Sequence, residues 1–151
     1  MRPKIYHIRR EGWSSYFELH VHKTAKSMRT AMQKDPLFVG MIEYDMIGCV
    51  CPVSCVDMVT GERDSLYAYM HLNEENLGVG VVAHECLHVA FAHERMMMFN
   101  MIYGDGCGRD EERIAYHLTD IIRGVYEVLN KNGHIKKGKN GNGGCSGKKD
   151  N

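Results

Sequence analysis

Three short stretches of the chain predict β-strands, and in the first of them apolar or aromatic positions alternate with polar ones. The stretches are residues 16–21, 41–53 and 65–72. Gly48 and Pro52 interrupt the second of them, so we expect that strand to bend or bulge. Between the first two stretches, apolar residues recur at helical spacing from Thr24, and Asp35-Pro36 ends this predicted helix.

Two longer segments have the period of a helix. The first is an apolar run over about 79–100, which follows the polar connection 73–80. The second has an apolar stripe with i, i+4, i+7 spacing; Asp110 is its expected N-cap and Asn132-Gly133 its expected end. The stripe consists of Ile114, Leu118, Ile121, Ile122, Val125 and Leu129.

The composition changes abruptly near the C-terminus. Residues 134–151 are dominated by lysine, glycine and asparagine, which bury too little apolar surface to order a chain. The sequence therefore predicts one folded domain over 1–133 and a flexible tail over 134–151. The length of 151 residues suffices for one domain with a substantial hydrophobic core.

Charge and apolar content restrict the expected partners and location. Lysine plus arginine equals aspartate plus glutamate, at 19 each, and the basic cluster lies in the tail, so we expect no nucleic-acid partner. No segment has the roughly 18 apolar residues needed to cross a bilayer, and the N-terminus lacks the apolar core of a signal peptide. We therefore expect a cytoplasmic protein without a membrane partner.

The six cysteines are expected to be reduced thiols in such a compartment. Cys49, Cys51 and Cys55 form C-x-C-x3-C, which differs from the C-x2-C spacing of common structural zinc sites. Buried or strand cysteines are the favoured interpretation, and a second metal site there is the less favoured one.

The chemistry of the sequence concentrates in His84-Glu85-Cys86-Leu87-His88, inside the first long helix. Residues four apart on a helix project from the same face, so both imidazoles can reach one zinc ion at about 2.0–2.1 Å. Zinc lowers the pKa of a bound water towards 7, and Glu85 is placed to accept its proton as a general base. The segment therefore predicts a catalytic zinc site.

A catalytic zinc ion takes three protein ligands, so one ligand is still needed. His93 is a poor candidate because it lies about 140° around the helix from His88. The adjacent carboxylates Glu111 and Glu112, at the start of the last helix, are the better source.

The motifs His84-Glu85-x-x-His88 and Glu112-Arg113-Ile114-Ala115-Tyr116 resemble those of the gluzincins, zinc peptidases with H-E-x-x-H on one helix and a glutamate ligand on the next. The resemblance covers about 65–129 and is closest to the minigluzincin subset and to small H-E-x-x-H proteins of bacteriophages and bacteria. It implies Glu112 as the third ligand. Glu111 stays open as the alternative, because it lies on the main apolar stripe of its helix.

The resemblance also implies further groups around the metal. The family often has an aspartate at the position of Tyr116 to orient a zinc-bound histidine, and a tyrosine or histidine that stabilises the oxyanion. Tyr103, His93 and His117 are candidates for the latter role. The family aligns substrates along an edge strand just before the active helix, and residues 65–72 occupy that place in the sequence.

The expected fold is therefore a small zincin-like α+β domain. A mixed sheet of three or more strands would pack against an active-site helix and a following ligand helix. The expected function is zinc-dependent hydrolysis of peptide bonds in a protein or peptide substrate, in the host cytoplasm if the protein is encoded by a phage. The alternative is a zinc-stabilised module without catalysis that binds another protein, such as a phage protein that engages a host factor.

Overall fold

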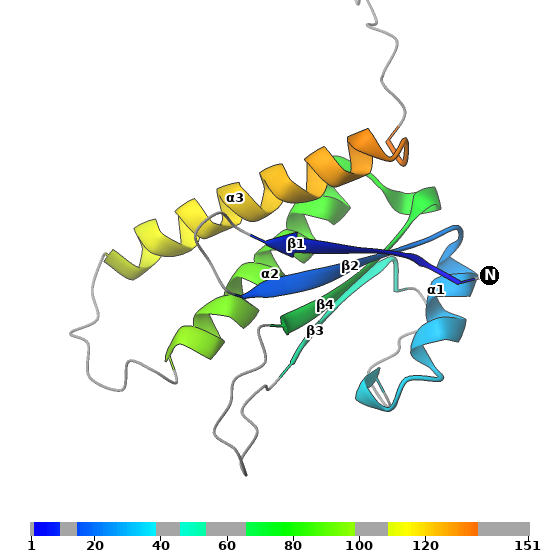
Figure 1. Ribbon diagram of the computed structural model, residues 1–151, viewed down its shortest axis with the longest axis horizontal. Coiled ribbons are helices and arrows are strands. Elements are labelled where there is room, and N and C mark those ends of the chain that lie inside the picture. Colours follow the sequence, from blue (N-terminus) through cyan, green and yellow to red (C-terminus); the bar gives the residue numbers. More distant parts are fainter. Residues whose placement is uncertain (1, 10–14, 39–45, 54–65, 99–108, 136–151) are drawn as a thin grey trace, which may run out of the picture.

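The computed structural model describes residues 2–9, 15–38, 46–53, 66–98 and 109–135. It is an α+β fold with one four-stranded sheet and three α-helices (Figure 1). The strands are β1 (Lys4–Arg9), β2 (Tyr16–His22), β3 (Gly48–Pro52) and β4 (Leu66–Asn73). The helices are α1 (Ala25–Met32), α2 (Val79–Met98) and α3 (Arg109–Lys131), with short 3₁₀ turns at Pro36–Phe38 (η1) and Glu74–Asn76 (η2).

The sheet is mixed and has the strand order β1-β2-β4-β3. β2 and β4 are parallel, whereas β1 pairs with β2 and β3 pairs with β4 in antiparallel orientation. β4 therefore lies inside the sheet, and the expectation that residues 65–72 form an edge strand is wrong. The edge strand on that side of the sheet is β3, which covers the last part of the predicted stretch 41–53.

Two hydrophobic cores lie on opposite faces of the sheet. The larger core packs β1, β2 and β4 against α2 and α3, which run side by side along one face (Figure 1). It includes Phe17, Leu19 and Met70 from the sheet and Val89 and Val125 from the helices. The smaller core packs α1 and η1 against the other face and consists of Met28, Met32, Phe38, Cys49 and Cys51. The period-two pattern of β2 follows from this arrangement, since Phe17, Leu19 and Val21 enter the larger core and alternate with less buried residues.

The boundaries of α1 follow from its sequence. The Thr24 side chain accepts a hydrogen bond from the Ser27 amide at 3.0 Å, and the Ser27 hydroxyl accepts one from the Thr24 amide at 3.1 Å. This reciprocal capping box satisfies two amides that the first turn of a helix leaves without helical partners. The expected helix from Thr24 is confirmed.

The last helix begins and ends within two residues of its expected limits. α3 starts at Arg109, so Asp110 lies inside the helix and is not the N-cap. Gly133, just after the helix, has φ +69°, a conformation that glycine adopts without strain. His134 is not part of a detached tail: its ring lies 2.7 Å from the Tyr6 hydroxyl and 2.8 Å from a Glu74 carboxylate oxygen. The packed part of the chain therefore continues at least to Ile135, and the rest of the predicted tail lies outside the described residues.

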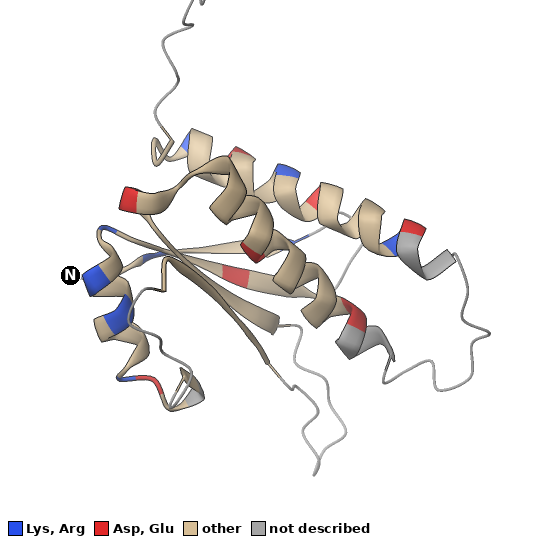
Figure 2. Cartoon of the chain, turned by 180° about the vertical axis from the view of Figure 1, so that it is seen from behind, with Lys and Arg blue, Asp and Glu red and all other residues tan. Residues whose placement is uncertain are grey.

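The sequence did not predict β1. Ile8 is the single buried residue of this strand, so its period-two pattern is weak. None of the helices in the described ranges is both long and apolar enough to span a membrane. Acidic and basic residues are interspersed along α3 (Figure 2).

Candidate functional site

The His84-Glu85-x-x-His88 segment lies in the middle of α2, and its two histidines are exposed on the outer face of the helix. Their Nε2 atoms are 3.2 Å apart, and their rings meet edge to face with centroids 4.8 Å apart. Two imidazole nitrogens at about 2.0–2.1 Å from a tetrahedral zinc ion are themselves separated by about 3.3 Å. The pair therefore has the separation that a shared metal ion requires.

Glu85 points away from the two histidines and into the molecule. It is one residue further around α2, and only 5% of its surface is exposed. A Cβ atom at Gly48 of β3 would lie 2.7 Å from Glu85 Oε1, so the carboxyl packs directly against the glycine. Burial raises the pKa of the Glu85 carboxyl, and the neighbouring His84 partly opposes that shift. A raised pKa suits a carboxylate that must accept and later release a proton.

A groove runs beside this segment, between the outer edge of β3 and α2. It has a volume of about 250 Å³ and is lined by Val50 and Pro52 of β3 and by His88, Phe91 and Ala92 of α2. In the sheet, β3 pairs with β4 on one side. β3 has no partner on its other side among the described strands, and a chain bound in the groove would lie next to His88.

The structure does not bring Glu112 to the two histidines. Glu112 is exposed in the first turns of α3, and it forms no group with His84 and His88 among the described residues. The Arg113 guanidinium contacts Glu94 at 2.6 Å, which places the first turns of α3 six residues beyond His88 on α2, or about 9 Å along the helix axis. The Glu111 side chain lies outside the described residues. The described part of the chain thus supplies two of the three expected ligands.

The other residues that the resemblance implies around the metal are also dispersed. Tyr116 is 66% exposed on α3, and nothing places it beside His84 or His88. His117 is buried, with its ring against that of His93. Tyr103 lies outside the described residues. Cys49 and Cys51 are buried residues of β3, in agreement with their favoured interpretation, and burial raises the pKa of Cys49 to about 12. Cys55 lies outside the described residues.

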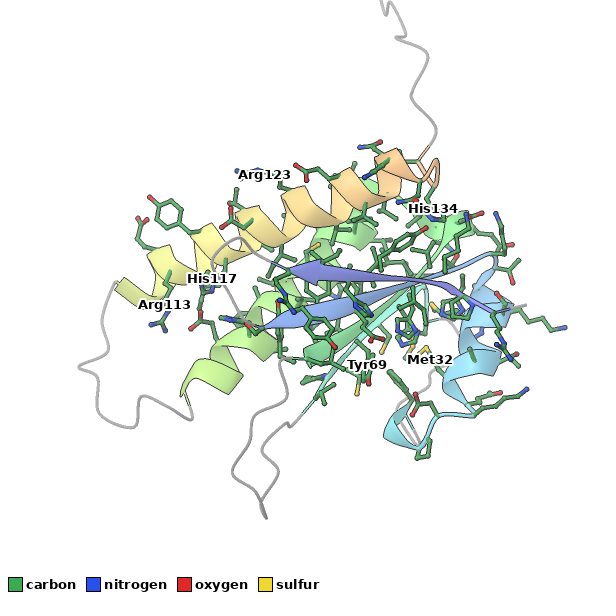
Figure 3. The ribbon with its side chains drawn as sticks, in the orientation of Figure 1. Met32, Tyr69, Arg113, His117, Arg123 and His134 are labelled. Carbon is green, nitrogen blue, oxygen red and sulfur yellow. The ribbon has the colours of Figure 1, made fainter. Side chains whose placement is uncertain are left out.

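The described residues contain one group of three side chains that could hold a metal ion, and it lies elsewhere: His93 and Glu94 of α2 with His117 of α3. One ligand atom from each lies within 4.8 Å of the other two. All three residues are buried, with 1%, 3% and 7% of their surfaces exposed. The His117 Nδ1 atom is 2.8 Å from Glu94 Oε1, and Arg113 donates to Glu94 Oε2 at 2.6 Å. Figure 3 shows Arg113 and His117 extending from the first turns of α3 towards α2.

The sequence alone indicates part of this group, through the position of His93 on α2. His93 lies about 140° around the helix from His88, which places it on the apolar side of α2 with Val82 and Val89. A histidine and a glutamate on such a buried face need polar partners, because burying them without any is costly. The sequence did not reveal that the partners are Arg113 and His117, since this depends on the register in which α3 packs against α2.

In comparisons with family models, curated proteins and solved structures, nothing matches this chain.

Proposed function

We propose that the protein is a zinc-dependent hydrolase of peptide bonds, with its active centre at His84, Glu85 and His88. The observation that carries this proposal is the 3.2 Å separation of the His84 and His88 Nε2 atoms on the helix that buries Glu85. The two imidazoles would hold the zinc ion. When bound, zinc supplies a Lewis acid and lowers the pKa of a coordinated water towards 7.

Glu85 is the general base of the proposed reaction. Its carboxylate accepts a proton as the water oxygen attacks the peptide carbonyl carbon, and it passes that proton to the amine nitrogen as the C–N bond breaks. The close packing of Gly48 fixes the position of the carboxyl. Burial keeps its pKa above the ordinary value, which makes the carboxylate a stronger base in the first step.

The substrate is proposed to bind along the outer edge of β3. A peptide in extended conformation can add to a free strand edge through backbone hydrogen bonds, with side-chain pockets giving specificity. Pro52 has no backbone N–H, so the hydrogen bonds on this edge depend on the other residues of β3. The groove between Val50 and Phe91 would receive a side chain of the bound peptide next to His88.

The central test is the dependence of peptide cleavage on zinc and on the histidine pair. We expect the purified full-length chain to cleave members of a peptide library, to lose this activity with a chelator and to regain it with zinc. The His84→Ala and His88→Ala variants should lose cleavage, whereas His7→Ala, which removes an exposed histidine from β1, should not. Undiminished cleavage in the chelated protein or in His88→Ala would refute the proposal.

Gly48→Ala should reduce cleavage through Glu85 alone. The added Cβ would lie 2.7–2.9 Å from Oε1, Cγ and Cδ of Glu85, so this side chain has to move. Misplacing a catalytic group by about 1 Å costs on the order of 10²-fold in rate. We expect kcat/KM to fall by about that factor, with a nearly unchanged Tm. Gly80→Ala is the matched control, because a Cβ there meets no atom within 4 Å.

A further inference from the structure

The buried group of His93, Glu94 and His117 lies on the opposite side of α2 from the proposed active centre. We propose that these three side chains bind a second zinc ion, which links the end of α2 to the beginning of α3. The proposal concerns a different set of ligands from His84 and His88, so it stands or falls independently of the proposed hydrolase activity.

The distances within the group fit one small cation. Zinc ligands at about 2.0–2.2 Å in tetrahedral arrangement are about 3.3 Å from one another. Glu94 Oε1 is 2.8 Å from His117 Nδ1 and 4.0 Å from His93 Nδ1, so the two separations bracket the required value. Two imidazoles and one carboxylate are a ligand set that zinc takes in open sites with three protein ligands.

The surroundings hold the ligands in place. Arg113 donates to the Glu94 oxygen that does not face His117, which fixes the plane of the carboxylate and leaves the other oxygen for a metal. Such hydrogen bonds to a ligating carboxylate are typical of metal sites. The His93 ring packs edge to face on the rings of Tyr67 and His117, with centroids 5.0 Å and 4.9 Å away. The imidazoles therefore have little freedom to rotate away.

A shift in the sheet register supplies one of these contacts. Tyr16 pairs with Leu66 and Phe17 pairs with Ala68, so Tyr67 is an extra residue of β4 at this point. A bulge of this kind redirects a side chain and is common next to functional sites. Here the Tyr67 ring turns to the face of the sheet that α2 covers and meets both Phe17 and His93.

A cavity gives access to the group. It has a volume of about 560 Å³ and lies between α3 and the adjoining ends of β1 and β2. Its wall includes Tyr67, His93 and His117, along with charged side chains of both signs such as Arg9 and Glu127. The cavity is large enough for several water molecules. An ion held by the three ligands would therefore have its fourth position open to water from this side.

The test uses the full-length protein with the other candidate centre removed. We expect the double variant His84→Ala/His88→Ala to bind one zinc ion per chain and the wild-type protein to bind two. Zinc at 100 times its Kd should raise the Tm of the double variant by about 5–10 °C. Adding His117→Gln should abolish both effects, whereas adding His7→Gln should abolish neither. Absence of zinc binding in the double variant would overturn the proposal.

A second measurement covers the case in which His117→Gln fails to fold. In crystals of the wild-type protein grown with zinc, anomalous scattering at the zinc absorption edge should place one ion between His93, Glu94 and His117. Cobalt(II) substitution of the double variant should give the visible absorption of a tetrahedral site. If crystals at saturating zinc show no anomalous peak between these three side chains, the second ion is excluded.

Discussion

Replacing Glu85 with glutamine is expected to lower kcat for peptide cleavage by about 10³-fold, while zinc binding by His84 and His88 is retained. Glutamine has nearly the same shape as glutamate, so it can occupy the space beside Gly48. Its amide cannot accept the proton of the attacking water, and the proposed reaction therefore loses its base. The fold should tolerate the change, because removing a buried carboxyl with a raised pKa introduces no new unpaired charge.

The measurement is steady-state cleavage of the best peptide substrate together with zinc content by metal analysis. Glu75→Gln is the matched control, since it makes the same chemical change in an exposed glutamate of η2. A Glu85→Gln protein that keeps full activity would eliminate Glu85 as the base. A protein that loses zinc together with activity would instead show that Glu85 supports the metal centre.

The sequence predicted the histidine pair because the relevant geometry is local. A four-residue spacing on a helix determines that two side chains share a face, whatever the rest of the fold does. α2 was expected over about 79–100 and spans Val79–Met98. The position of Glu112 relative to this pair is not local. It depends on how far α2 extends beyond His88 and on the register in which α3 returns along it.

The structure gives the physical reason for the separation of Glu112 from the pair. α2 extends ten residues beyond His88, and Glu94 in that extension forms the ion pair with Arg113. The side of α2 that faces α3 carries Ala90 and Glu94, whereas His84 and His88 face outward. The residue spacing of a family motif cannot predict such a contact, because one of its two partners, Glu94, lies outside the motif.

The strand order of the sheet shows a similar limit. The run of apolar and aromatic residues in 65–72 predicted a strand correctly, and β4 spans Leu66–Asn73. The same pattern does not state which neighbours a strand has. The nearly continuous burial of β4 is the signature of an interior strand, since residues on both of its faces are covered. β1, in contrast, is exposed along most of its length, and its pairing with β2 defines it as a strand more than its own composition does.

Acidification from pH 7 to pH 4 is expected to cost the folded state on the order of 5 kcal/mol, through two buried histidines on the α1 side of the sheet. His22 Nε2 lies 3.1 Å from His71 Nδ1, and the two rings are 1% and 5% exposed as residues. Burial, aided by the nearby His20, lowers the pKa of His22 to about 4. Burial, with His20 and His22, lowers the pKa of His71 to about 3.

The sign of the effect follows from these shifts. In the unfolded chain both histidines take up protons near pH 6.5, whereas in the folded chain they stay neutral until about pH 4 and pH 3. Their contribution is complete above pH 6.5 and falls as the pH drops towards the folded values. Each proton bound by the unfolded chain alone costs about 1.4 kcal/mol per pH unit.

Among the described residues, those that pack on the pair are mainly apolar or neutral. α1 contributes the apolar Met28 and Met32 to this face, and η1 contributes Phe38, whose ring contacts His71 edge to face. β3 contributes Cys49, which is opposite His71 in the sheet and whose pKa burial raises to about 12. The carboxylate of Glu18 contacts the neighbouring His20 at 2.8 Å. A proton on His22 or His71 would therefore remain uncompensated inside the smaller core.

Urea unfolding at a series of pH values measures this linkage directly. The wild-type free energy of unfolding should fall between pH 6.5 and pH 4. Its slope should approach the value expected when the unfolded chain binds two more protons than the folded chain. His71→Gln removes one of the two groups and should reduce the slope by about one proton, whatever its effect on stability at pH 7. His7→Gln, at an exposed position of β1, should leave the slope as it is. An unchanged slope in His71→Gln would mean that the acid sensitivity has another source, because one buried imidazole accounts for one proton.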